Sequence, residues 1–197
     1  WQKKYAWIAV LGGARLLKRA GDIIIGSAAL ICLSPLFLIV ALCIKLTDGG
    51  PILFWQSRVG RWGREFPFPK FRSMVTNAEK LKDSLLAQND HQDSVTFKMK
   101  HDPRVTWIGR IIRKLSIDEL PQLWLVVTGD MSLVGPRPPV PREVALYTLA
   151  DRRRLDVTPG LTCIWQVSGR GDIPFHEQVE LDVQYIASQS LWLDIKL

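Results

Sequence analysis

The sequence predicts a mainly α-helical protein with a few short strands, an α+β fold that carries a membrane segment at its N-terminal end. Two observations lead to this prediction. Residues 23–44 contain no charged side chain. The rest of the chain alternates helical patterns with short strand patterns that Pro and Gly interrupt. With 197 residues, 47% of them apolar, the chain is long enough for one good core.

The composition points to an anionic partner. The net charge is +7 and the pI is about 9.5, which suits a nucleic acid, a phosphorylated metabolite or a membrane surface. Eight Trp residues favour a bilayer interface among these. Cys32, Cys43 and Cys163 are too scattered for a disulfide framework and form no C-x-x-C pair, so a reducing cytosolic setting is expected.

The apolar segment 23–44 is predicted to enter the membrane. As a straight helix its 22 residues would extend about 33 Å, and a bilayer core is about 30 Å thick. Ser34 and Pro35 lie at its midpoint, where Pro removes a backbone donor and bends the helix. Each half would then match one leaflet.

Basic residues flank this segment on both sides, which the positive-inside rule assigns to the cytoplasm. The flanking cations are Lys3, Lys4, Arg15, Lys18 and Arg19 before the segment, and Lys45, Arg58, Arg61, Arg64, Lys70 and Arg72 after it. We therefore predict a re-entrant helix-break-helix that turns at Ser34-Pro35. A spanning helix with a Pro kink and a buried core helix are the alternatives. Residues 5–19 are interpreted as an interfacial segment, or as the end of an upstream transmembrane helix.

Two parts follow from this interpretation. We expect residues 1–48 to form the interfacial segment and the re-entrant membrane helix, and residues 49–197 to form one cytosolic body, a single functional unit, with further interfacial amphipathic helices. The chain begins at Trp1 and stops inside an apolar run at Leu197, so we interpret it as a fragment of a longer protein.

The first half of the body reads as a strand, a turn and an extended segment, followed by helical patterns. Residues 51–60 predict a strand, 60–63 a turn, and 65–74 an extended segment interrupted by prolines. Residues 77–92 are polar and helix-prone, as in a surface insertion. Residues 105–115 repeat apolar and basic side chains at helical spacing.

In the second half of the body, the segments with a helical or strand pattern are shorter. Residues 120–127 predict a buried helix, and residues 132–141 a loop stiffened by prolines. An amphipathic stretch covers residues 143–154, a strand-and-turn pattern covers 159–170, and helix returns from residue 175 to the end.

Several common chemistries lack their motifs here. The sequence contains neither a Walker-type loop nor a G-x-G-x-x-G loop. These are the usual phosphate-binding motifs of ATPases and of dinucleotide-binding enzymes, so neither class is expected. His91, His101 and His176 do not have the H-E-x-x-H spacing, so zinc chemistry is not expected.

Adjacent carboxylates at Asp118 and Glu119 are the main candidate for chemistry. If Asp118 is the N-cap of the next helix, Pro121 falls where a missing N–H costs nothing, so the dyad would lie at a positive helix end. An acidic N-cap often only stabilises its helix. Cations nearby favour a phosphate ligand: Arg110, Arg113 and Lys114 lie upstream, and Arg137 is held between Pro136 and Pro138, which is otherwise an ordinary surface turn. One carboxylate could bind Mg²⁺ while the other attacks phosphorus.

Four motifs in this order resemble the bacterial sugar transferase family, the monotopic phosphoglycosyl transferases. They are Lys70-Phe71-Arg72-Ser73-Met74, the run from Arg113 to Gln122, the run from Gly129 to Pro138, and Pro159-Gly160-Leu161-Thr162 with the following run from Trp165 to Arg170. The resemblance extends from about Lys18 to the C-terminus, with Ile117 where Leu is usual. It implies a membrane helix bent at a Ser-Pro pair, here Ser34-Pro35.

The resemblance implies a two-step transfer with a ping-pong course. Asp118 would attack the β-phosphorus of a UDP-sugar and release UMP, and Glu119 would hold Mg²⁺. The phosphate of undecaprenyl phosphate would then attack the aspartyl phosphosugar. Lys70, Arg72, Arg113 and Arg137 match family positions near the phosphates. The motif at 159–170 is left as a nucleotide or sugar contact, or as local folding.

The setting follows from the same resemblance. We expect a protein at the cytoplasmic face of the bacterial inner membrane that contacts membrane lipids, starts exopolysaccharide or O-antigen synthesis, and uses UDP-glucose or UDP-galactose. The resemblance also suggests a homodimer, and no nucleic acid partner. The alternative is a non-catalytic, membrane-anchored basic scaffold or nucleic-acid-binding module. The aromatic residues disfavour it because they cluster with apolar runs rather than with the basic residues.

Overall fold

The computed structural model describes residues 2–78, 80–81, 102–169 and 173–197, with side chains from residue 13 onward. The chain folds into two compact units. The first unit comprises Trp1–Cys32, Ser57–Phe68 and Gln122–Leu197, and the second comprises Leu33–Gln56 and Pro69–Pro121. Neither unit begins or ends at residue 48. The boundary predicted there separates a membrane part from a cytosolic part, and it stays a prediction.

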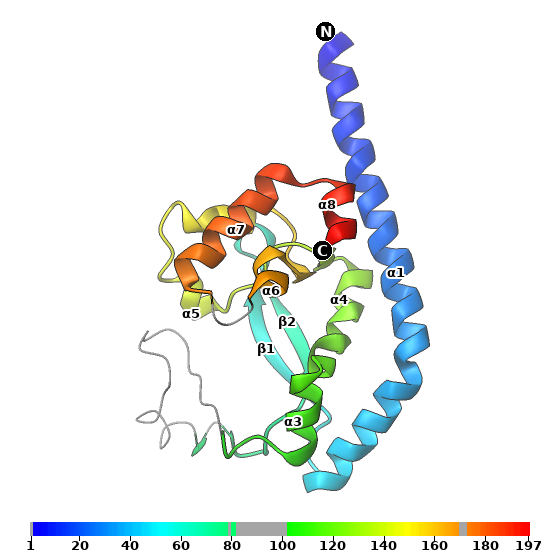
Figure 1. Ribbon diagram of the computed structural model, residues 1–197, viewed down its shortest axis with the longest axis vertical. Coiled ribbons are helices and arrows are strands. Elements are labelled where there is room, and N and C mark those ends of the chain that lie inside the picture. Colours follow the sequence, from blue (N-terminus) through cyan, green and yellow to red (C-terminus); the bar gives the residue numbers. More distant parts are fainter. Residues whose placement is uncertain (1, 79, 82–101, 170–172) are drawn as a thin grey trace. The chain divides into compact units, whose positions relative to one another are not determined.

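A single long helix, α1, covers Gln2–Asp48 (Figure 1). Its part from Gly13 to Asp48 is long and apolar enough to cross a membrane, by length and composition alone. The helix continues through Ser34 with Pro35 inside it, so the predicted break is not confirmed and re-entry stays a prediction. Ile31, Leu38 and Leu46 are 74%, 72% and 77% exposed, which excludes a buried core helix.

The predicted strand and the turn after it are confirmed. Strand β1 (Leu53–Val59) pairs with β2 (Glu65–Phe71), and the short 3₁₀ helix η1 (Arg61–Gly63) turns between them (Figure 1). The segment predicted only as extended is thus a strand that carries Lys70 at its end. Its prolines are compatible with a two-stranded sheet because each strand has an unpaired edge.

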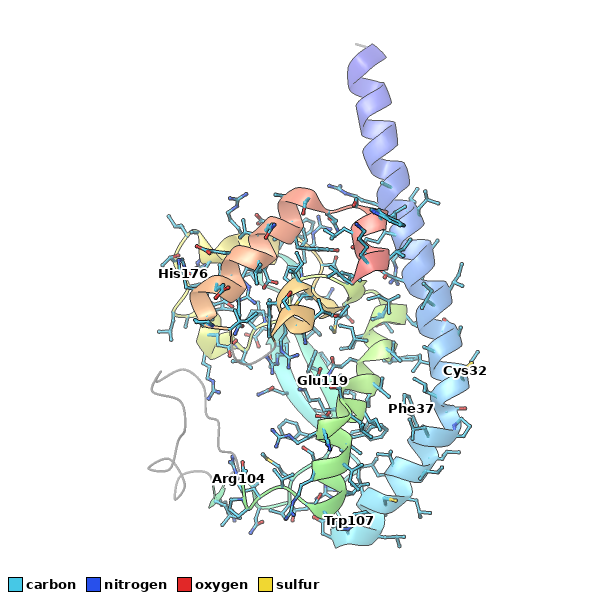
Figure 2. All side chains as sticks on the ribbon, viewed as in Figure 1. Cys32, Phe37, Arg104, Trp107, Glu119 and His176 are labelled. Atoms are coloured by element: carbon cyan, nitrogen blue, oxygen red, sulfur yellow. The ribbon has the colours of Figure 1, made fainter. Side chains whose placement is uncertain are left out.

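The second unit has its core between the end of α1 and helix α3 (Trp107–Lys114). Thr106 caps α3 by accepting a hydrogen bond from the Gly109 amide at 3.0 Å, which confirms the predicted helix over 105–115. The buried members of the core are Val40, Ile44, Phe71, Ile108 and Ile112. Phe37, labelled on α1 in Figure 2, packs on this cluster. Its ring meets that of Phe71 edge to face, with the ring centroids 5.5 Å apart.

The first unit holds most of the remaining elements. In chain order they are α4 (Leu123–Thr128), β3 (Ser132–Val134), α5 (Pro141–Val144), η4 (Asp151–Asp156), β4 (Gly160–Thr162), α6 (Ile164–Ser168), α7 (Phe175–Ser188) and α8 (Leu191–Lys196). Helix α4 confirms the predicted buried helix, and its Leu125 and Val126 form a core with Phe66, Phe68 and Met131. Strands β3 and β4 pair in parallel.

Charged side chains at the start of the apolar segment fasten α1 to the first unit. Lys18 Nζ donates to Asp194 Oδ2 at 2.6 Å, and the Arg19 guanidinium donates to two carbonyls at the end of α4. Asp22 accepts from the Leu133 amide at 3.0 Å. These ionic groups therefore satisfy backbone and side-chain partners within the unit rather than facing lipid.

The predicted loop at 132–141 begins with strand β3, and the predicted strand-and-turn pattern at 159–170 contains helix α6 after β4. Two further predicted segments also differ in detail. Residues 143–154 do not form one amphipathic helix, because the Asp151 carboxylate accepts hydrogen bonds from the amide and hydroxyl of Thr148, both at 2.8 Å, in the turn between α5 and η4. The C-terminal helix is divided at Ser190, whose hydroxyl caps α8. Of the predicted insertion at 77–92, only residues 77–78 and 80–81 lie within the described residues.

Candidate functional site

The acidic pair lies in the first turn of η3, a 3₁₀ helix that covers Ile117–Gln122 and follows α3 almost directly. Ser116 takes a left-handed conformation (φ 57°) between the two helices, and its carbonyl accepts from the Glu119 amide at 3.3 Å. Helical geometry therefore begins at Ile117, one residue before Asp118. The prediction that Asp118 is the N-cap is wrong, although both carboxylates do lie at the beginning of the helix.

Asp118 is a buried carboxyl with 9% of its surface exposed. Burial raises its pKa above the ordinary value of 3.8, because the charged form loses hydration. The positive charge of Lys70 opposes this shift and the neighbouring Glu119 carboxylate adds to it, while Arg113 also lowers the pKa. A poorly hydrated carboxylate beside cations suits nucleophilic attack on an anionic substrate.

Glu119 points to the end of β2. Lys70 Nζ donates to Glu119 Oε1 at 2.8 Å, and both side chains are about one-fifth exposed, at 20% and 22%. Figure 2 shows Glu119 in the segment that joins α3 to α4. The second unit thus brings Lys70, Asp118 and Glu119 together from sequence positions about 50 residues apart.

Arg72 has a different set of partners from the one that the sequence suggested. Its guanidinium binds both carboxylate oxygens of Asp48, with Nη1 at 2.6 Å from Oδ2, and its Nε donates to the Pro51 carbonyl at 2.5 Å. Arg72 is 7% exposed, and the hydrogen bonds from it lower the pKa of Asp48. This pair fastens the end of α1 to β2. Sequence reasoning missed Asp48, which was part of a turn signal (Asp48-Gly49-Gly50-Pro51) and gave no hint of a long-range partner.

Arg137 belongs to the first unit, in the loop after β3, and is partly buried. It stays a predicted member of the site. Arg170, the last residue of the fourth motif, lies outside the described residues.

The acidic pair has the donor atoms for one divalent ion but not for a complete protein cage. Across the described ranges, no group of three or more His, Cys, Asp or Glu side chains is close enough to hold a metal. Mg²⁺ is usually held by one or two carboxylates, with substrate phosphates and water completing the shell. The dyad therefore fits an ion that is shared with a phosphate ligand. His176 is exposed and lies 3.2 Å from Glu180, while His91 and His101 fall outside the described residues.

Comparison with known proteins gives one family. Residues 13–197 match the family model described as bacterial sugar transferase. The chain is 54% identical over 151 residues to "Galactosyl transferase CpsE" of Streptococcus agalactiae serotype III, covering 76% of this chain and 33% of the relative. It is 46% identical over 188 residues to "Undecaprenyl-phosphate galactose phosphotransferase" of Salmonella typhimurium, covering 93% and 39%.

A third relative matches over most of its own length. "Exopolysaccharide production protein ExoY" of Sinorhizobium fredii is 42% identical over 191 residues, covering 95% of this chain and 84% of the relative. The chain thus spans between a third and two-fifths of the first two relatives.

Proposed function

Since this chain belongs to the bacterial sugar transferase family, we propose that it transfers a sugar 1-phosphate from a UDP-hexose to undecaprenyl phosphate and releases UMP. The observation that carries the proposal is the buried Asp118 beside Glu119 and Lys70. Two relatives are named for galactose and one of these for undecaprenyl phosphate. UDP-galactose is therefore the first donor to test, with UDP-glucose next.

Asp118 acts as the nucleophile in this proposal. One carboxylate oxygen forms a bond to the β-phosphorus, and the bond from that phosphorus to the oxygen of UMP breaks, with UMP leaving as the anion. A phosphate oxygen of undecaprenyl phosphate then attacks the same phosphorus and displaces the Asp118 carboxylate. Burial supports both steps, because it removes water that would solvate the carboxylate or hydrolyse the intermediate.

Lys70 and Glu119 help the site to accommodate the negative charges of Asp118 and the donor phosphates. The Lys70 ammonium holds Glu119 and offsets part of the cost of ionising Asp118. Glu119, with a donor phosphate, would hold Mg²⁺, which when bound neutralises charge on the pyrophosphate. Arg113 lies in the last turn of α3, and its positive charge also lowers the pKa of Asp118.

The membrane segment would place this chemistry at the lipid surface. We propose that α1 re-enters the inner leaflet at Ser34-Pro35 with both ends on the cytoplasmic face. The exposed apolar side chains of α1 and the cations on both sides of residues 23–44 support this arrangement. An enzyme embedded in one leaflet can bind undecaprenyl phosphate at the membrane interface, where the phosphate group of this lipid lies.

A UMP-release assay tests the function. The purified protein in lipid nanodiscs is mixed with undecaprenyl phosphate, MgCl₂ and one of several UDP-sugars, and free UMP is measured. We expect sustained release with one UDP-hexose, no more than a single turnover without the lipid phosphate, and none from Asp118→Asn. Sustained release without the lipid, or none with any donor, would contradict the proposal.

A further inference from the structure

The turn that follows α1 surrounds the guanidinium group of Arg72. Both carboxylate oxygens of Asp48 accept hydrogen bonds from it, and the Pro51 carbonyl accepts from its Nε at 2.5 Å. A Cβ at Gly50 would lie only 2.9 Å from Nη1, so the turn leaves no space for a side chain at that position. All three nitrogens of this buried guanidinium therefore have partners within the second unit.

The same contacts fix the end of β2, from which the Lys70 side chain extends. The Phe71 side chain is buried in one core with Val40 of α1, and the Arg72 amide donates to the Ile52 carbonyl at 2.9 Å. The backbone directly after Lys70 is thus held twice, by the packing of Phe71 and by the ion pair of Arg72 with the end of α1.

The partner of Lys70 is supported by the same core. Ile117, the residue before Asp118, packs on the cluster that contains Phe71. Two residues later, Glu119 accepts a hydrogen bond from Lys70 Nζ at 2.8 Å. Hydrogen bonds of this kind extend over about 2.7–3.2 Å, so a shift of the strand end by about 1 Å would break this one.

We propose that Arg72, held by Asp48, is a positioning residue that keeps the end of β2 where Lys70 reaches Glu119, and that Arg72 does not itself bind phosphate. The inference rests on the proposed function, in which the Lys70 ammonium holds Glu119 beside the nucleophile. The half of α1 from residue 33 to residue 48 is then part of the support of the site. Loss of the Asp48–Arg72 pair releases Lys70 and slows the attack on the donor.

Lysine labelling tests the position of Lys70 directly. The wild type and Asp48→Asn in lipid nanodiscs are treated briefly with acetic anhydride, and acetylation of each lysine is measured by mass spectrometry. An ion pair keeps an amine protonated and slow to react, so Lys70 should be acetylated about tenfold faster in Asp48→Asn. Lys18 is the internal control, because it is paired with Asp194 at 2.6 Å and is 18% exposed, against 20% for Lys70.

Transfer shows whether this position matters for the reaction. The first-turnover rate of UMP release is measured with saturating UDP-hexose and MgCl₂, without lipid acceptor, for the wild type, Asp48→Asn, Lys70→Met and the double variant. We expect Asp48→Asn to slow release by about tenfold, as for a small misplacement of a group in the site. The double variant should be no slower than Lys70→Met alone, because Asp48 acts through Lys70.

Gly50→Ala is a second variant that keeps every charge. Its Cβ would displace the Arg72 guanidinium from Asp48, so it should change labelling and rate in the same direction as Asp48→Asn. It carries the test if Asp48→Asn fails to fold, judged by circular dichroism and thermal unfolding. Gly21→Ala is the matched control, since a Cβ there meets nothing within 4 Å, and it should behave as the wild type does.

Two results would overturn the positioning role. One is a folded variant in which the labelling of Lys70 or the release rate stays at the wild-type value. The other is equal loss of protection at Lys18 and Lys70, which would show only a general loss of stability. A wild type that releases no UMP from any donor contradicts the proposed function instead, and its lysine labelling still decides whether the Asp48–Arg72 pair positions Lys70.

Discussion

Lys70 at the end of β2 and Glu119 in η3 form an ion pair, with Nζ 2.8 Å from Oε1. The pair lies beside the buried Asp118, whose pKa it affects from both sides, since Lys70 lowers it and Glu119 raises it. If Glu119 holds Mg²⁺ as proposed, Lys70 and the metal ion would compete for the same carboxylate.

Lys70→Met tests this competition. Without the ammonium, Glu119 and Asp118 present two carboxylates with no direct counter-ion, so Mn²⁺ should bind several-fold more tightly in the absence of nucleotide. Transfer should fall by about tenfold or more, because a partly buried charge loses its partner. Lys114→Met, which removes an exposed lysine of α3, is the control. Mn²⁺ binding is followed by electron paramagnetic resonance, and equal affinity in both variants would contradict competition at Glu119.

Arg72→Met separates a structural role from a phosphate-binding role. Because Arg72 is buried against Asp48, we expect about 2 kcal/mol of destabilisation, or a melting temperature lower by about 4–8 °C. The exposed Arg64, 4.0 Å from Asp130, should cost little when changed to Met. Normal melting with weaker UDP binding would instead support the phosphate contact.

The same pair makes a prediction about acid. The pKa of Asp48 is lowered in the folded protein, so its contribution to stability is present above the unfolded value of 3.8 and is lost as the pH falls through the lowered pKa. The melting temperatures of the wild type and Arg72→Met should therefore converge below about pH 3.8. A constant difference down to pH 2 would argue against the ion pair.

Asp182 in α7 gives the opposite pH dependence. It is fully buried with Oδ2 2.6 Å from Arg154 Nη2, and burial raises its pKa to about 6 despite that attraction. Stability from the protonated form is present below 3.8 and is lost as the pH rises through about 6. The wild type should therefore melt progressively lower, relative to Asp182→Asn, between pH 4 and pH 7. A flat difference over this range would show that Arg154 keeps the carboxylate ionised.

Topology is tested by cysteine labelling. Arg15→Cys and Pro51→Cys, each made after Cys32 and Cys43 are replaced by Ser, place one thiol on either side of the apolar segment. With a re-entrant α1, a membrane-impermeant maleimide added to intact spheroplasts should label neither thiol, and both should react once the cells are opened. Labelling of one position from outside would show that α1 spans the membrane.

Local patterns in the sequence predicted most of the fold, and non-local contacts account for what they missed. The hairpin at 53–71 and helix α3 carry their own signals, namely strand residues around a glycine turn and apolar residues at helical spacing. The parallel pairing of β3 with β4 joins residues 28 positions apart (132 to 160), and no local pattern encodes it. The ion pair between Asp48 and Arg72 could not be predicted for the same reason, because it too joins residues far apart in the sequence.

The candidate site shows the same division. Family motifs indicated Asp118, Glu119 and Lys70, and the second unit brings these three residues together. The prediction of Asp118 as an N-cap failed because Ser116 takes a left-handed conformation and helical geometry starts one residue earlier. Residue type alone did not show that Arg72 forms an ion pair with Asp48, because an arginine can bind a phosphate equally well.

The central claim is that Asp118 becomes covalently bonded to phosphorus. The most direct measurement is the mass of the protein, and of its Asp118 peptide, after incubation with a UDP-hexose and MgCl₂ but no lipid acceptor. We predict a mass increase of one phosphohexose at Asp118, released on addition of undecaprenyl phosphate, and no increase for Asp118→Asn. The exposed Asp156→Asn should behave as the wild type does. An active wild type that never carries the adduct, or an adduct that persists in Asp118→Asn, would contradict the account.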